Sequence, residues 1–331
     1  MGMSKKSNDK KIKGWHYIPT VPLQVSPFFS FPLSPEKMWR WVFNRWLSVT
    51  ENLIILIIAT LTWYFWQPAL KDVNAFSFAW IGQLWIRNFV LLAVVAGCLH
   101  WFFYVRKVQG KKLKYDPRDL SVKGRKFTLG SQVKDNMFWS LISGVGVWTL
   151  YETIVFWAMA NSIAPVLIFD NNPIVFIVWF LLTPVWISFH FYWTHRLLHW
   201  PALYKLVHSV HHRNVNVGPW SGLSMHPIEH LIFFSSIGIH FIIPTDPLHV
   251  LFHMQHQALQ AASSHTGYES MLVKDKKALA LGTFHHQMHH RYFEVNYGTL
   301  EMPWDKWFGT FHDGTVEMHE KLKEQRSVKK V

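Results

Sequence analysis

Cysteine is almost missing from this chain. Cys98 is the single cysteine among 331 residues, so no intrachain disulfide and no Cys-x-x-Cys zinc or redox site can form. The sequence also contains no Glu-x-x-His motif, the pattern that soluble di-iron proteins place on the helices of a bundle. These two absences exclude thiolate metal sites and the soluble type of di-iron carboxylate site.

The sequence also shows neither the pattern of a removable leader nor a long linker. The N-terminal stretch "MGMSKKSNDKKIKGWHY" carries lysines, but no apolar core and no small-residue cleavage site follow it at the usual distance. No repeat, low-complexity tract or long Pro/Gly linker separates two folded domains. We therefore expect no cleaved signal peptide, and a division of the chain by function instead of by linkers.

Long apolar runs dominate the first half of the chain. Half of all residues are hydrophobic, and they gather in runs at roughly 52–67, 84–105, 137–160 and 174–193. A bilayer core takes about 20 mainly apolar residues, so the last three runs fit directly and the first is slightly short. The composition predicts an all-α integral membrane protein with about four transmembrane helices.

The net charge of +13 is distributed unevenly. Residues 106–136 hold ten Lys and Arg against three Asp. Ranges 68–83 and 161–173 together hold a single basic residue, Lys71. This asymmetry predicts that the N-terminus and the basic loop face the cytoplasm, and that four crossings return the chain to the cytoplasm just before His195. The excess charge then serves topology and attraction to anionic headgroups, and we expect no nucleic-acid partner.

Histidine is concentrated in the second half, where 19 of the 21 histidines lie between His190 and His319. Three clusters have helical spacing: His195 and His199 in "HRLLH", His208, His211 and His212 in "HSVHH", and His286, His289 and His290 in "HHQMHH". Residues three and four apart are neighbours on a helix, so each cluster can aim two or three imidazoles at one point. Eight imidazoles exceed the four ligands of one zinc ion and therefore predict two metal ions, whose identity stays open.

The order HxxxH, HxxHH and late HxxHH after several apolar runs resembles the membrane di-iron fatty acid hydroxylase and sterol desaturase superfamily. The segments "PALYKLVHSVHH", "SMHPIEH", "SHTGY" and "HHRYFEVNYG" are similar to its sterol desaturase, lathosterol oxidase-like branch, and the likeness covers about residues 174–312. The resemblance implies transmembrane helices capped by a cytosolic, helical, His-rich domain that binds two iron ions. It also implies dioxygen as co-substrate.

Carried over position by position, the resemblance implies nine metal ligands. They are His195, His199, His208, His211, His212, His265, His286, His289 and His290. Of these, His265 in "SHTGY" matches an additional ligand upstream of the last box. Whether His226, His230 or His285 also binds metal is open, and no catalytic residue beyond the ligands is implied.

Carboxylates near the boxes have a supporting role in this interpretation, because ligating histidines usually donate their second N–H to a carboxylate, a carbonyl or water. The candidates are Glu229, Glu269, Glu301 and Asp305, for which an ordinary surface position is the alternative. The segment "HPIEH" also matches the H-x-x-E-H pattern of a zinc protease with Glu229 as general base. That pattern leaves eight other histidines unexplained.

These observations divide the chain into four segments. We expect a cytosolic N-terminal segment at 1–50, a transmembrane bundle at 51–193 with a basic cytosolic loop at 106–136, a His-rich di-iron region at 194–316 with a short membrane hairpin near 231–262, and a charged tail at 317–331.

The predicted function is that of an oxygen-dependent membrane oxidase that hydroxylates or desaturates a C–H bond of a sterol or fatty-acyl lipid. A fused haem-binding His-Pro-Gly-Gly segment is missing, so electrons should come from a separate protein such as cytochrome b5, a ferredoxin or a reductase. The histidines should face the cytoplasm, at the endoplasmic reticulum of a eukaryote or the inner membrane of a bacterium. The alternative is a membrane zinc or iron transporter or metal-binding protein.

Overall fold

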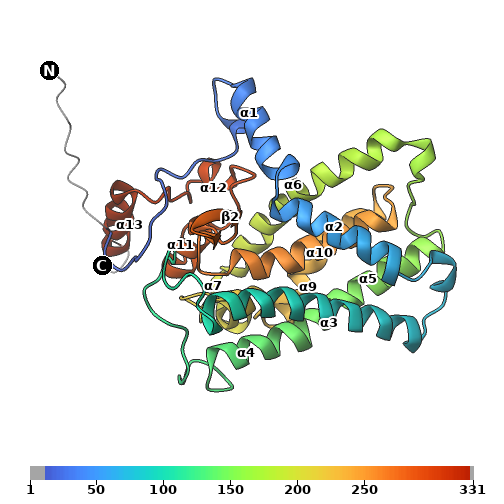
Figure 1. The fold of residues 1–331 in the computed structure, drawn as a ribbon, viewed down its shortest axis with the longest axis horizontal. Coiled ribbons are helices and arrows are strands. Elements are labelled where there is room, and N and C mark those ends of the chain that lie inside the picture. Colours follow the sequence, from blue (N-terminus) through green and yellow to red (C-terminus); the bar gives the residue numbers. More distant parts are fainter. Residues whose placement is uncertain (1–11, 329–331) are drawn as a thin grey trace.

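The computed structural model describes residues 12–328, and these form a helical body (Figure 1). The helices are α1 (Pro35–Val42), α2 (Glu51–Trp66), α3 (Phe78–His100), α4 (Gln132–Phe138), α5 (Val145–Ala160), α6 (Pro173–Leu198), α7 (Pro201–Leu203), α8 (Ser209–His212), α9 (Pro227–Phe234), α10 (Pro247–Ser264), α11 (Phe284–Tyr292), α12 (Trp304–Trp307) and α13 (Val316–Val328). One antiparallel hairpin, β1 (Ser270–Val273) and β2 (Lys276–Ala280), is the only sheet in the described part. The prediction of an all-α class is thus confirmed apart from this hairpin.

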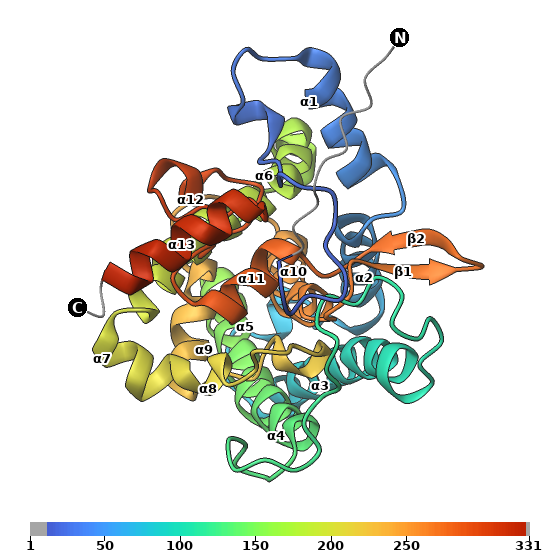
Figure 2. The ribbon, with the colours of Figure 1, turned by 90° about the vertical axis from the view of Figure 1, so that its left-hand side faces the viewer.

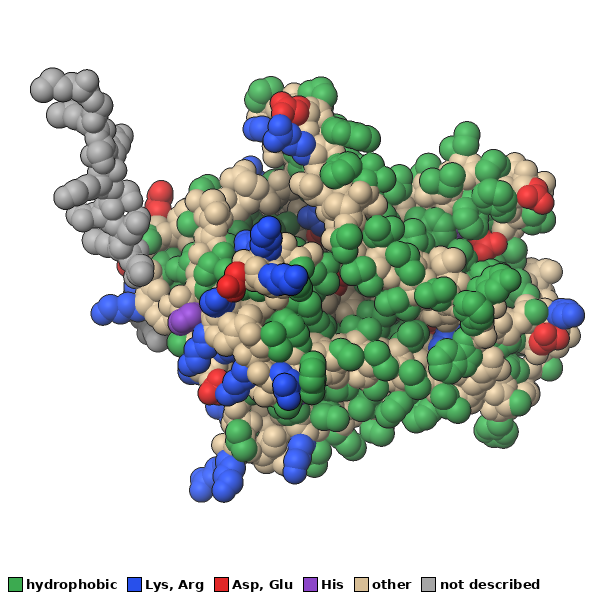
Figure 3. All heavy atoms as spheres, in the orientation of Figure 1, with side chains coloured by type: hydrophobic (Ala, Val, Ile, Leu, Met, Phe, Trp, Pro, Cys, Tyr) green, Lys and Arg blue, Asp and Glu red, His purple; other side chains and the backbone are tan. Residues whose placement is uncertain are grey.

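Four helical stretches are long and apolar enough to cross a membrane. They are Pro35–Trp66, Phe78–Val105, Gln132–Ala160 and Pro173–Leu198. Each contains one of the apolar runs found in the sequence, so the predicted spans are confirmed. Figure 3 shows apolar side chains over most of the body, with Lys and Arg gathered at one end. The side of the membrane on which that end lies stays a prediction.

A fully buried ion pair joins two of these stretches. Arg87 of α3 and Glu152 of α5 form a salt bridge, and both side chains are 0% exposed. Asn88 Nδ2 donates to Glu152 Oε2 at 2.9 Å, and Trp148 Nε1 donates to Glu152 Oε1 at 2.9 Å. Charged groups at membrane depth are costly unless they are paired, and this pair has polar partners on both carboxylate oxygens.

Helix α10 is the centre of the body. Asp246 Oδ1 accepts the Leu248 N–H at 2.8 Å, so the helix begins with a side-chain cap followed by Pro247 at its first position. Most of its side chains are buried against α2, α3, α5 and α6. The segment predicted as a short membrane hairpin, 231–262, contains the second half of α9, a 3-10 turn at Ser235–Phe241 and most of α10. Its depth in a bilayer stays a prediction.

The other predicted boundaries also stay predictions. Helix α6 runs without a break through residues 193 and 194, where the membrane bundle was expected to end. The expected N-terminal segment and tail include residues 1–11 and 329–331, which lie outside the described residues.

The His-rich elements gather at one end of the body, and Figure 2 looks at this end. The N-terminal segment joins them from far away in sequence. The ring of Trp15 packs edge-on against Phe284 of α11 at 4.9 Å between centroids, and Leu23 N donates to Asp313 O at 2.8 Å. Segments from both ends of the chain therefore close over the helices that carry the histidines.

The buried ion pair gives the first testable prediction. We expect Glu152→Ala to lower the free energy of unfolding by about 3–5 kcal/mol, because it leaves the Arg87 guanidinium buried without its carboxylate. Unfolding of the protein in detergent micelles measures the difference. Glu36→Ala is the matched control, since the Glu36–Arg40 pair is 72% and 74% exposed and such pairs contribute about 0–1 kcal/mol. Equal losses in the two variants would contradict the assigned role of the buried pair.

Candidate metal centre

Nine histidines converge in two groups at the His-rich end. The first group consists of His195, His199, His208, His212 and His289, and the second of His211, His265, His286 and His290. Within each group the ligand nitrogens all lie within 4.8 Å of one another. These are the nine ligand candidates of the sequence analysis, and all of them except the half-buried His199 are buried.

The two groups do not coincide with the three histidine boxes of the sequence. In "HSVHH", His208 and His212 join the first group and His211 joins the second. The third box divides too, with His286 and His290 in the second group and His289 in the first. Each of these two boxes thus aims two imidazoles at one group, as its helical spacing allows, and sends the third to the other group. The reason is helical: residues four apart share a face, whereas successive residues are turned by about 100°.

The Nε2 atoms within each group are closely and evenly spaced. In the first group His199, His212 and His289 form a triangle with sides of 3.1, 3.1 and 3.0 Å. In the second group the Nε2 atoms of His265, His286 and His290 form a triangle with three sides of 3.1 Å. A neutral imidazole nitrogen is a donor or an acceptor but never both, so three such atoms cannot all satisfy one another. A shared cation satisfies all three lone pairs.

The spacing and the number of the nitrogens bear on the kind of coordination. With a metal–nitrogen distance of about 2.0–2.1 Å, two ligands at a right angle lie about 2.8–3.0 Å apart, and two at the tetrahedral angle lie about 3.3–3.4 Å apart. The observed separations of 3.0 and 3.1 Å lie between these values. The first group also offers five nitrogens, one more than a tetrahedral zinc ion takes.

Burial keeps these imidazoles uncharged. It lowers the pKa of several of them well below the ordinary value, and neighbouring histidines lower it further: His208, His211, His212, His286, His289 and His290. Burial also lowers the pKa of His265 to about 4. Metal ions bind the neutral form of histidine, so the groups are in the protonation state that coordination requires.

Backbone carbonyls fix which nitrogen faces each group. His195 Nδ1 donates to Tyr297 O at 2.6 Å, and His289 Nδ1 donates to Val295 O at 2.7 Å. His265 Nδ1 donates to Ala261 O at 2.8 Å. A proton held on Nδ1 leaves the lone pair on Nε2, the atom that points into the group. This is the usual arrangement around metal-binding histidines.

Comparison with known proteins agrees with this geometry. The family model for fatty acid hydroxylase matches residues 180–310, which include all nine histidines. The chain carries a fatty acid hydroxylase domain. The resemblance noted from the sequence is thereby confirmed, and no solved structure matches the chain.

The relatives of the hydroxylase domain include sterol desaturases. The chain is 27% identical over 148 residues to a Delta(7)-sterol 5(6)-desaturase of Candida glabrata, covering 41% of this chain and 38% of that protein. It is 30% identical over 125 residues to the Saccharomyces cerevisiae protein of that name, covering 36% and 32%. A Delta(7)-sterol-C5(6)-desaturase of Nicotiana tabacum is 26% identical over 256 residues, covering 72% and 87%. The alignments thus span well under half of the fungal relatives and most of the plant one.

Among the four candidate carboxylates, Glu229 contacts a histidine of the first group directly. Its Oε1 accepts from His208 Nδ1 at 2.7 Å, and both side chains are buried. Asp305 acts one step further out, because it accepts the backbone N–H groups of Tyr297 and Gly298 at 2.8 Å each. It thus holds the Tyr297 backbone, whose carbonyl accepts from His195.

The other two carboxylate candidates have different partners. Glu269 accepts from the Tyr115 hydroxyl, and Glu301 forms an ion pair with Arg45. Both line the cavity described below.

The three histidines left open by the sequence lie outside both groups. His226 caps α9 through its Nδ1, which accepts the Ile228 N–H at 3.2 Å. His230 bonds through both ring nitrogens, to Ser143 Oγ at 2.9 Å and to a backbone carbonyl at 3.0 Å. His285 Nε2 lies 3.7 Å from Asp305. Since His226 and His230 do not converge, the structure does not support the zinc-protease reading of "HPIEH".

Several remaining histidines form a buried chain behind α10. Gln257 uses its amide N–H on a backbone carbonyl, so its Oε1 must accept from Ser236 Oγ at 2.8 Å. Ser236 then accepts from His253 Nε2 at 2.9 Å, and His253 Nδ1 accepts from His240 Nε2 at 3.0 Å. The His240 Nδ1 finally accepts from Thr245 Oγ1 at 2.7 Å. Every donor in this chain is used once, so hydrogen bonds within the protein account for both histidines.

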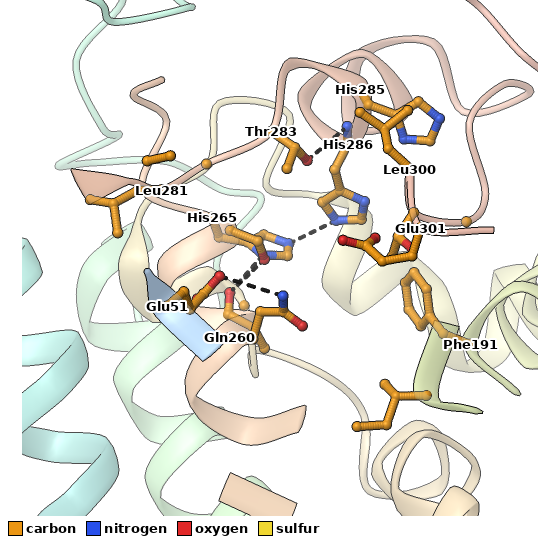
Figure 4. Close-up of a pocket in the computed structure, with 18 of the residues that line it drawn as sticks. Glu51, Phe191, Gln260, His265, Leu281, Thr283, His285, His286, Leu300 and Glu301 are labelled. Atoms are coloured by element: carbon orange, nitrogen blue, oxygen red, sulfur yellow. Dashed lines mark hydrogen bonds between the residues drawn. The ribbon is translucent and has the colours of Figure 1, made fainter. Parts of the chain in front are cut away.

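A cavity of about 940 Å³ opens beside both histidine groups (Figure 4). Its lining includes His195 and His208 of the first group and His211, His265 and His286 of the second. The volume is near the upper end of the range of about 300–1,000 Å³ that is typical of ligand sites. A bound molecule can therefore contact both groups from one cavity.

Adjacent histidines allow a sharp test of the ligand assignment. We expect His286→Ala to remove the second group's metal ion, so that the purified protein retains about half of the wild-type metal. His285→Ala should retain the wild-type amount, because its side chain lies outside both groups although it lines the same cavity. Elemental analysis of the purified variants measures the ratio. Equal metal loss in both variants would contradict the assignment.

Glu229 should tune the first group without binding metal itself. Removing the outer partner of a metal-binding histidine typically weakens metal affinity about 10–100-fold, and we expect this for Glu229→Ala. Competition with a chelator measures the affinity of the folded protein. Glu317→Ala, in the first turn of α13, is the control and should leave the affinity unchanged. An unchanged affinity in Glu229→Ala would show that His208 is held without it.

Proposed function

We propose that this protein is an oxygen-dependent di-iron oxidase of the membrane that oxidises a C–H bond of a lipid, with a sterol as the favoured substrate. The observation that carries the proposal is the meeting of two neutral histidine groups with one cavity in a chain that has four membrane-length apolar helices. The names of the relatives, which describe action on Delta(7)-sterols, support the sterol.

The nine histidines would hold two iron ions, five ligands on one ion and four on the other. Iron accepts imidazole ligands, and the five nitrogens of the first group exceed the four that a tetrahedral zinc ion takes. When bound, the ions supply the activation of dioxygen that oxidation of an unreactive C–H bond requires.

The chain's own part is to place a carbon atom and to exclude water. Phe191 lies between the two groups, with ring centroids 4.8 Å from His195 and 6.3 Å from His286. An apolar carbon packed against this ring lies beside both groups at once. Apolar side chains such as Ile187 and Phe233 continue the cavity wall and keep water from the reacting carbon.

The reaction consumes two electrons from a donor, which is a separate protein in this proposal. Desaturation removes two hydrogen atoms from the lipid, and with two electrons and two protons from outside it reduces one dioxygen to two waters. Hydroxylation differs in keeping one oxygen on the lipid and releasing one water. The names of the relatives favour desaturation.

The proposal places the His-rich end at the cytoplasmic face. The basic loop at residues 106–136 lies at the same end of the molecule as α11 and α13, where Figure 3 shows Lys and Arg gathered. The positive-inside asymmetry supports this side, and a cytoplasmic electron donor could then reach it.

A metal transporter is the weaker alternative. It would need ionisable groups free to bind an ion along the bundle, but the buried Arg87 and Glu152 are paired with each other. The histidine groups also lie beside a large cavity lined with apolar side chains, which suits a lipid better than a hydrated ion.

A comparison of lipids in expressing cells tests the proposed function. We expect one lipid class to lose two hydrogen atoms or gain one oxygen atom when the intact chain is expressed with oxygen and reductant available. The change should be lost in His289→Ala, a ligand variant, and kept in His16→Ala, whose exposed side chain lies outside both groups. Untargeted mass spectrometry measures the difference. Identical lipid profiles with sterol and acyl substrates supplied would contradict the proposal.

A further inference from the structure

One corner of the cavity is polar and is formed by residues outside the two histidine groups. Glu51, in the first turn of α2, reaches across to α10, where it accepts from Ser263 Oγ and from Gln260 Nε2 at 3.4 Å. Glu51 and Gln260 both line the cavity. Figure 4 shows the two side chains together on the side of the cavity where His265 lies.

The polar corner is close to the second histidine group along α10. Ser263 lies two residues before His265, and the Ala261 carbonyl next to Gln260 accepts from His265 Nδ1. A rise of about 1.5 Å per residue puts the whole corner within about one and a half helical turns of His265. A group held at Glu51 is thus a few bonds away from a carbon held at the metal groups.

The acidic and basic side chains of the cavity lining indicate which kind of group the cavity can hold. The carboxyl groups of the whole lining are Glu51, Glu229, Glu269 and Glu301, and its basic side chains besides histidine are Arg45 and Lys277. Arg45 is paired with Glu301, and Lys277 is an exposed residue of β2. The lining therefore offers more hydrogen-bond acceptors than cations, which suits a neutral hydroxyl better than a phosphate or carboxylate headgroup.

Glu51 has the capacity for one more donor. The oxygens of a carboxyl group accept hydrogen bonds in either protonation state, and the two contacts with α10 use part of this capacity. A lipid hydroxyl that leaves water needs such an acceptor, because an unpaired buried hydroxyl is costly.

We propose that Glu51, positioned by Gln260 and Ser263, accepts a hydrogen bond from a hydroxyl group of the lipid substrate and so determines which carbon lies at the histidine groups. The inference rests on the proposed function. It restricts the substrate to neutral lipid alcohols such as sterols, and it excludes free fatty acids and phospholipids that would place their charged group in this corner.

The test compares a Delta(7)-sterol with its methyl ether, which keeps the shape and loses the donor. The wild-type protein should prefer the free sterol by up to about tenfold in kcat/KM, the range that one net hydrogen bond typically contributes. In Glu51→Gln the preference should shrink to a few-fold through a higher KM for the sterol, with kcat and the values for the ether almost unchanged. Glu36→Gln, an exposed glutamate of α1, should behave as wild type.

A binding measurement separates this inference from the proposed function. The sterol should raise the thermal unfolding temperature of wild type more than the ether does, and Glu51→Gln should reduce the difference, whether or not any turnover occurs. If both probes stabilise wild type equally, or if Glu51→Gln weakens both to the same extent, the hydroxyl-binding role of Glu51 is overturned. A wild-type protein that distinguishes the probes but oxidises neither would refute the oxidase and leave the Glu51 role standing.

Discussion

The structure depends on one constraint: nine imidazoles, nearly all buried and neutral, must bring their Nε2 lone pairs together in two groups. Nitrogen atoms 3.0–3.1 Å apart cannot all hydrogen-bond one another, so each group is arranged to share a cation. The ends of α6, α8, α10 and α11 must therefore meet at one place, although they are up to about 90 residues apart in sequence. Backbone carbonyls and Glu229 then orient the rings from behind.

The membrane-length helices serve this meeting point. Helix α10 is buried against α2, α3, α5 and α6 and ends at His265, and the same helix lines the cavity through Gln257 and Gln260. Apolar walls and an acceptor-rich corner thus come from the elements that deliver the ligands. The position of the lipid and the position of the metal ions are coupled through one rigid helix.

The sequence predicted the apolar spans and eight of the histidines, because run length and helical spacing are local properties, whereas His265 came only from the family resemblance. It could not assign histidines to groups: His211 and His289 leave their box partners, and this depends on how α8 and α11 pack. It also could not show that Glu51 meets Gln260, since 209 residues separate them. The hairpin β1–β2 was missed because its strands, "SMLV" and "KKALA", are short and carry little alternation.

X-ray absorption at the metal edge of the purified, metal-loaded protein tests the central claim most directly. The account predicts iron with a first shell of about four to five nitrogen atoms at about 2.0–2.2 Å and the outer scattering pattern of imidazole rings. It also predicts a second iron within a few ångströms. A tetrahedral zinc shell, a shell made mainly of oxygen, or a protein that binds no metal tightly would contradict it.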